Sequence, residues 1–138
     1  ELLPDGSLIT YVYNIEDEHH LEYALSRDLG TTWSETGKAF FEKKIRNPQM
    51  TAFRGGYVLH GRSGQFGEGS GHFVLYTSED GIHWDSGQYL KLREAGLGAY
   101  SNNVKVHTPG SPSDERLLIQ ASHAYEDSKT NVYHWWLV

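Results

Sequence analysis

Two stretches of the sequence decide the fold: LEYALSRDLGTTW at residues 21–33 and FVLYTSEDGIHW at residues 73–84. In each, an alternating run of side chains leads into Ser, any residue and Asp, followed by a Gly and a Trp. The alternation predicts a β-strand with one buried face, and Asp followed closely by Gly predicts a tight turn. The tryptophans Trp33 and Trp84 lie 51 residues apart. The chain therefore contains an internal repeat.

The repeat extends to a second strand that precedes each copy and begins at a Gly turn. This strand reads PDGSLITYVY at residues 4–13 and RGGYVLHGR at residues 54–62. A third copy reads DERLLIQASHAY at residues 114–125 and leads into TNVYHWWLV at residues 130–138. The copies recur every 50 to 60 residues or so, with about four short strands in each unit, which is the size of a β-propeller blade.

The composition supports an all-β fold and excludes several classes of protein. The 138 residues include 15 Gly and 13% aromatic residues, which suits a turn-rich β protein. The absence of cysteine excludes disulfides and thiolate metal sites. A net charge of −6 argues against nucleic acid as a partner, and no apolar run is long enough to span a membrane. The nearest approaches to a helical pattern are short, at residues 40–46 and 89–96.

The motif Ser26-Arg27-Asp28-Leu29-Gly30-Thr31-Thr32-Trp33 resembles the Asp-box, also called the bacterial neuraminidase repeat, and residues 78–84 resemble a shortened form of it. Two such boxes at blade spacing make the chain similar to the sialidase-like β-propellers. In that family the box lies on the outer rim, between the third and fourth strands of a blade. The structural residues implied are Ser26, Asp28, Gly30, Trp33, Ser78, Asp80, Gly81 and Trp84.

The resemblance implies a six-bladed propeller, of which this chain supplies about two and a half to three blades. The single domain of residues 1–138 divides into approximate blades at residues 1–38, 39–90 and 91–138. The chain begins at Glu1 and its one methionine is Met50, so we expect it to be a piece of a longer protein or one member of a homo-oligomer that completes the ring. Exposed strand edges and apolar blade faces favour such association, and we expect the isolated chain not to be a stable monomer.

The resemblance also implies hydrolysis of glycans that carry an acidic sugar. Sialidases hold the sugar carboxylate with arginines and attack with a tyrosine that a glutamate activates. A neutral tyrosine avoids repulsion from the carboxylate, but it needs a neighbouring base because its ordinary pKa is near 10. Bidentate arginine contacts suit a planar carboxylate. The reaction needs no metal and no cofactor.

Several residues match parts of that machinery. Tyr100, in the segment Gly98-Ala99-Tyr100-Ser101-Asn102, is the candidate nucleophile, and Asn102 is a candidate substrate-binding residue. Arg62, at the end of a predicted strand, is the candidate carboxylate ligand, ahead of Arg46 and Arg93. The sequence has Gln49 where the family often has the activating Glu, and Glu68 in a Gly-rich loop could replace it. Solvent-exposed and packing roles remain open for each of these residues. The histidines on predicted strands, including His60, are expected to be satisfied core positions or sheet-edge residues, with the lining of a pocket as the alternative.

Two functional hypotheses follow. The first is part of an exo-sialidase-like glycoside hydrolase, and the second is a non-catalytic Asp-box propeller that binds carbohydrate or supports an assembly. The partner expected in both is a glycan or small carbohydrate, with no nucleic acid and no membrane. The resemblance suggests a secreted or periplasmic protein, and whether an acidic residue reaches the Tyr100 hydroxyl distinguishes the two hypotheses.

Overall fold

The chain is built entirely from antiparallel β-sheets wherever the computed structural model describes it, namely at residues 1–64, 72–90, 100–126 and 129–138. No helix occurs in these ranges. The ten strands within them are β1 (Leu8–Tyr13), β2 (His20–Ser26), β3 (Gly37–Phe40), β4 (Arg46–Phe53), β5 (Gly56–Arg62), β6 (Phe73–Ser78), β7 (Gln88–Leu90), β8 (Ser101–Thr108), β9 (Ser111–Glu126) and β10 (Lys129–Leu137). The all-β prediction is confirmed.

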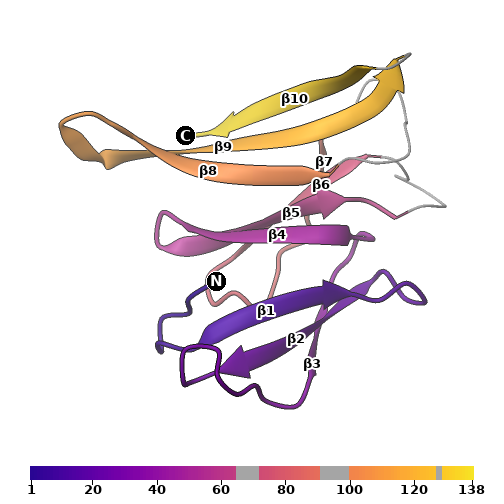
Figure 1. Ribbon diagram of the computed structural model, residues 1–138, viewed down its shortest axis with the longest axis vertical. Helices are drawn as coiled ribbons and strands as arrows, with labels where there is room; N and C mark the ends of the chain where they lie inside the picture. The colour runs from indigo at the N-terminus through magenta and orange to yellow at the C-terminus, as the bar shows by residue number, and fades with distance from the viewer. Residues whose placement is uncertain (65–71, 91–99, 127–128) are drawn as a thin grey trace.

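The strands form three sheets that follow one another along the chain. The first sheet has the order β1-β2-β3, the second β4-β5-β6-β7 and the third β10-β9-β8. Figure 1 shows them stacked, with the second sheet between the other two. The β4–β5 and β8–β9 pairs are joined by short connections, at residues 54–55 and 109–110, because antiparallel pairing allows tight hairpins. At the β4–β5 hairpin, Arg54 and Gly55 have φ angles of 50° and 80°, a region that glycine adopts readily.

The segment at residues 40–46 is not helical, contrary to its weak pattern. Phe40 ends β3, Arg46 begins β4, and the residues between them connect the first sheet to the second. Phe41 and Ile45 in this connection are buried, so the apolar residues serve the core between the sheets rather than one face of a helix. In the second segment with a weak helical pattern, at residues 89–96, the first two residues belong to β7. Residues 91–96 lie outside the described residues.

Each sheet packs against the next one through the side chains on one of its faces, which come from alternate residues of its strands. Between the first and second sheets lies a buried cluster of Leu21, Ala39, Phe41, Ile45, Leu59, Val74 and Tyr76. Between the second and third sheets lies another, of Val58, Phe73, Leu75, Leu117, Ile119 and Ala121. Adjacent residues of a strand point to opposite faces, so the second sheet contributes Leu59 to one cluster and Val58 to the other. The middle sheet is therefore buried on both faces.

Buried tyrosines add polar contacts between the first two sheets. The Tyr76 hydroxyl donates to the Lys43 carbonyl at 2.6 Å and accepts from the Lys43 N–H at 2.9 Å. The Tyr11 hydroxyl donates to the Gly81 carbonyl at 2.6 Å. These bonds satisfy hydroxyls that would otherwise lose hydration on burial, and they fix the second sheet against the first.

The outer faces of the first and third sheets have no described neighbour. Val12 and Phe40 on the first sheet are exposed, as are Val132 and Trp136 on the third. Their strand neighbours, such as Tyr11 and Trp135, pack inward. Both ends of the stack therefore present apolar side chains of the kind that the inner interfaces bury.

The two tryptophans of the repeat have different surroundings. Trp84 stacks on Phe41, with ring centroids 6.0 Å apart, and meets Tyr11 edge-on at 6.3 Å. Trp33 is 45% exposed. Trp84 therefore packs between two sheets, whereas Trp33 does not, because the described chain has no sheet on the outer side of the first one.

Candidate functional site

The two ends of the sheet stack differ in character. One end, the turn end, carries the two turns of the repeat (residues 26–33 and 78–84, called the Asp turns) and the hairpins that join β4 to β5 and β8 to β9. These hairpins lie on the left in Figure 1. The opposite end, the loop end, contains the start of β4, the end of β5 and the start of β8. Arg62, Tyr100 and Asn102 all lie toward the loop end.

The Asp turns are held by hydrogen bonds within themselves. Asp28 accepts from the Thr32 N–H at 2.8 Å and from the Thr32 hydroxyl at 2.6 Å, and Ser26 accepts from the Gly30 N–H at 2.8 Å. The Thr32 hydroxyl, the Thr32 N–H and the Ser26 hydroxyl lower the pKa of Asp28 to about 2. The φ angle of Gly30 is 89°, a conformation that a side chain disfavours. The carboxylate is therefore committed to its own turn.

The second Asp turn repeats this arrangement. Asp80 accepts from the Ile82 and His83 N–H groups, each at 2.8 Å, and Ser78 accepts from the Gly81 N–H at 2.8 Å. Partial burial opposes ionisation of Asp80, but the His83 ring and these N–H groups lower its pKa. The φ angle of Gly81 is 80°. Both aspartates are occupied at the turn end, away from the arginines at the loop end.

Two arginines meet at the loop end. Arg46 begins β4 and lies opposite Arg62, which ends β5, in the strand register. This backbone pairing, next to a register shift in β4, places both arginines at the same end of the second sheet. Sequence reasoning ranked Arg46 below Arg62, because nothing in the sequence shows which residues of β4 and β5 pair.

Arg46 is held by residues of the first sheet. Its Nε lies 2.9 Å from Glu18 Oε1, and the two side chains are only 8% and 10% exposed. Its guanidinium carbon lies 5.2 Å from the centre of the Tyr13 ring. A cavity of about 530 Å³ adjoins this ion pair and is lined by Ile15, Glu16, Asp17, Glu18, His19, Lys44 and Arg46. The Arg46 charge is thus already balanced within the chain.

The Nε atoms of Arg62 and Arg46 are both buried without a hydrogen bond among the described residues, but Arg46 Nε lies in an ion pair with Glu18, whereas Arg62 has no carboxylate partner in the described part of the chain. The side chain as a whole is partly exposed. A guanidinium carries donors in a planar fork that matches a carboxylate, and a buried donor without a partner costs free energy. Arg62 is therefore the described cation best prepared to accept an anionic ligand.

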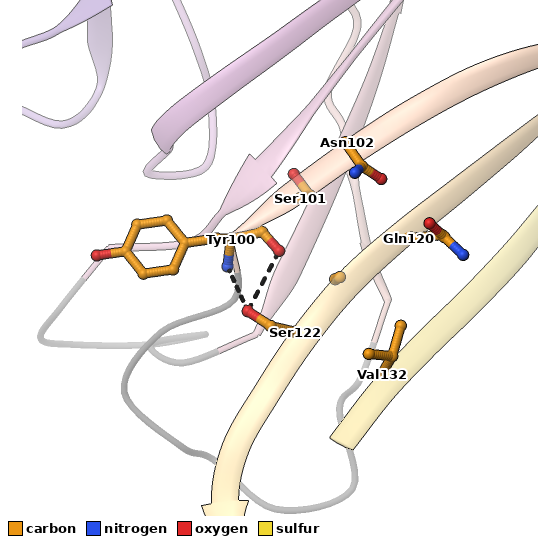
Figure 2. Close-up of a pocket in the computed structure, with 7 residues that line it drawn as sticks. Tyr100, Ser101, Asn102, Gln120, Ser122 and Val132 are labelled. Atoms are coloured by element: carbon orange, nitrogen blue, oxygen red, sulfur yellow. Dashed lines mark hydrogen bonds between the residues drawn. The ribbon is translucent and has the colours of Figure 1, made fainter. Parts of the chain in front are cut away.

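Tyr100 is exposed and lacks an activating group in the described structure. Its side chain is 67% exposed, and no described residue forms a hydrogen bond with its hydroxyl. The Tyr100 N–H donates to the Ser122 hydroxyl at 3.1 Å, which in turn donates to the Tyr100 carbonyl at 3.3 Å. In Figure 2 the Tyr100 ring projects to the side opposite Asn102 and Gln120. The backbone of Tyr100 is thus held by Ser122, and its hydroxyl has no hydrogen-bond partner among the described residues.

A shallow cavity of about 270 Å³ lies beside Tyr100 on the third sheet. Its lining is mostly polar or small: Tyr100, Ser101, Asn102, Gln120, Ala121, Ser122 and Val132. Asn102 and Gln120 are cross-strand partners in β8 and β9. Amides of this kind can exchange hydrogen bonds with sugar hydroxyls, so Asn102 lies in surroundings suited to a carbohydrate.

The two candidate bases do not reach Tyr100 in the described structure. Gln49 is exposed on β4, where His60 is its strand partner, and an amide does not take up a proton. Glu68 lies outside the described residues. Arg93, the weakest arginine candidate, also lies outside them. The structure pairs the backbones of Arg62 and Arg46, but within the described ranges it brings no acid to the Tyr100 hydroxyl.

His60 is a functional candidate for which the sequence favours a core or sheet-edge position. It is fully buried, and its ring nitrogens contact Ser101 and Asn103 across the second and third sheets. The expectation of a satisfied core histidine is confirmed. Burial lowers its pKa to about 4, so the ring is neutral at pH 7.

The described ranges contain neither a candidate metal site nor a candidate membrane-spanning helix. No group of three or more His, Asp or Glu side chains there has an arrangement that could hold a metal ion. None of the described segments forms a helix with the length and hydrophobicity to cross a bilayer. Neither the protein-family models nor the curated proteins give a match for this chain.

Proposed function

We propose that this chain is part of a sialidase-like β-propeller that binds a glycan through an acidic sugar at the loop end. The observation that carries the proposal is the buried Nε of Arg62, which has no hydrogen-bond partner among the described residues, in the strand partner of Arg46. Arg46 is neutralised by Glu18, which leaves Arg62 to pair with a ligand carboxylate. Asn102 and Gln120, on the outer face of the third sheet, would supply a second contact to sugar hydroxyls.

Binding without hydrolysis is the form of the proposal that the geometry favours. Hydrolysis would need a base at the Tyr100 hydroxyl, and no described residue contacts that group. Gln49 stands where the resemblance implies a glutamate, and Glu68 lies outside the described residues. The hydrolase hypothesis therefore becomes the rival that the experiment must test.

The repeated stacking of sheets supports the propeller part of the proposal. Each inner interface buries apolar residues from two sheets, and the outer faces carry Phe40 and Trp136 exposed to solvent. A ring removes such faces by closing. We propose that a second copy, or further sheets of a longer chain, covers them.

Titration with sialyllactose, using lactose as the neutral control, tests the binding proposal. We expect sialyllactose to bind and lactose not to, and Arg62→Met to weaken binding by a factor of ten or more, since a charge-assisted hydrogen bond contributes roughly 1.5–3 kcal/mol. Arg27→Met is the matched control, because Arg27 is exposed in an Asp turn at the opposite end. Equal affinity of the wild type and Arg62→Met would refute the role of Arg62.

Release of 4-methylumbelliferone from its sialoside separates the two hypotheses. The binding proposal expects no turnover by the chain in its assembled form. Turnover that Tyr100→Phe abolishes would establish the hydrolase instead. Light scattering measures the assembly itself, and a mass equal to the 15.7 kDa of one chain, together with a cooperative melt, would refute association.

A further inference from the structure

A buried polar network joins the second sheet to the third next to the proposed site. His60 on β5 is 0% exposed, and its Nδ1 lies 3.0 Å from the Ser101 hydroxyl oxygen. Its Nε2 lies 2.9 Å from the side-chain nitrogen of Asn103. The ring also packs against Phe73, with centroids 5.4 Å apart. Both ring nitrogens therefore have partners on β8.

The hydrogen-bonding capacity of these partners determines which ring nitrogen of His60 carries the proton. The amide nitrogen of Asn103 only donates, so Nε2 of His60 must accept and carries no proton. A neutral imidazole then carries its proton on Nδ1, which donates to the Ser101 hydroxyl. The groups that meet the ring from β6 and β8, namely Phe73, Ser101 and Asn103, do not titrate. The charged residue on the same face of β5 is Arg62, two residues along.

The network lies on the side of the third sheet that faces Arg62. Its β5 member precedes Arg62 by two residues on the same face of the strand, and its β8 members lie on either side of Asn102, whose side chain therefore points to the other face of the third sheet. We propose that His60 is a positioning residue, which fixes β8 to β5 and thereby sets the position of Arg62 relative to the start of β8. This inference rests on the proposed function, because it assigns His60 to the same carbohydrate site.

The substitutions that test the inference differ in the hydrogen bonds they keep. His60→Gln retains one donor and one acceptor and cannot titrate, whereas His60→Leu retains neither. We expect His60→Leu to weaken sialyllactose binding by about tenfold, the effect of losing roughly 1.4 kcal/mol, and His60→Gln to restore most of the affinity. The matched control is His107→Leu, since His107 is exposed on β8 toward the turn end. Unchanged affinity in a folded His60→Leu variant would overturn the inference.

The dependence of affinity on pH gives a second readout that simple packing would not move. Protonated His60 would place two donors, on Nε2 and Asn103, against each other. We expect wild-type affinity to fall below pH 5 more steeply than that of His60→Gln. Parallel pH profiles for the two proteins would contradict a role for the neutral ring.

Two measurements keep the test independent of the ligand. Long-range ¹H–¹⁵N NMR reads which ring nitrogen carries the proton, and we expect Nδ1 in the wild type and Nε2 in Asn103→Asp. Amide exchange at Ser101 and Asn102 should accelerate in His60→Leu. If the wild type fails to bind sialyllactose, the proposed function fails, and these measurements still decide the network: a proton on Nε2 of the wild type, or unchanged exchange, would overturn it.

Discussion

His60 gives the folded chain a stability that depends on pH. In the folded state burial lowers the pKa of His60 from 6.5 to about 4, because a charged imidazole between two sheets would lose its hydration. In the unfolded chain the ring has its ordinary pKa of about 6.5. Between these values the unfolded state binds a proton that the folded state does not, so the free energy of unfolding falls as the pH falls.

The size of this effect follows from the two pKa values. A difference of about 2.5 in pKa corresponds to about 3 kcal/mol, of which about 2.5 kcal/mol is lost by pH 4.5. That is a large part of the 5–15 kcal/mol typical of a folded domain. The aspartates with lowered pKa values affect the free energy of unfolding at lower pH than His60 does. The pKa of Asp28, for example, is lowered from 3.8 to about 2, so its contribution is lost only as the pH falls through that range.

Urea denaturation at pH 7 and pH 4.5 measures the effect, with His60→Gln as the comparison. We expect the wild type to lose about 2.5 kcal/mol more than His60→Gln between the two pH values. His134→Leu, at an exposed position, should lose as much as the wild type. Equal losses for the wild type and His60→Gln would refute the claim that His60 is buried in its neutral form.

Three further substitutions test the packing that positions the site, each by urea denaturation at low protein concentration. Trp84→Ala should cost about 3–5 kcal/mol because its ring packs between two sheets, whereas Trp33→Ala, at 45% exposure, should cost less than about 1 kcal/mol; similar costs would contradict the asymmetry. Gly61→Ala should lower the free energy of unfolding by about 1–3 kcal/mol or more, because the added Cβ would lie 2.5 Å from the Arg46 carbonyl oxygen. An unchanged free energy of unfolding would refute this close approach. Glu18→Gln should cost about 3 kcal/mol by leaving the Arg46 charge without its carboxylate, and a loss below 0.5 kcal/mol or so, as at ordinary surface positions, would show the pair to be solvated.

The sequence predicts the candidate residues of the site, but it does not predict which residues they contact. Arg62 is predicted from its place at the end of a strand and Asn102 from the segment that carries Tyr100, and both lie toward the loop end. The partnership of Arg46 with Glu18 joins residues of two different sheets, and a single sequence does not show how sheets pack on one another. Tyr100 was identified from a local motif, but the surroundings of its hydroxyl depend on other segments of the chain.

The sequence by itself determined the local structure of this protein. Side-chain alternation specifies strands such as β2, and the Ser, Asp and Gly of each Asp turn hydrogen-bond within a few residues of one another, so neighbouring positions are sufficient to define them. The tertiary structure decided everything that depends on sheet stacking. Trp33 and Trp84 occupy the same position in the repeat, yet only Trp84 is covered, because burial depends on which sheet lies alongside. His60 likewise reads as an ordinary core residue until β8 supplies Ser101 and Asn103 on its two nitrogens.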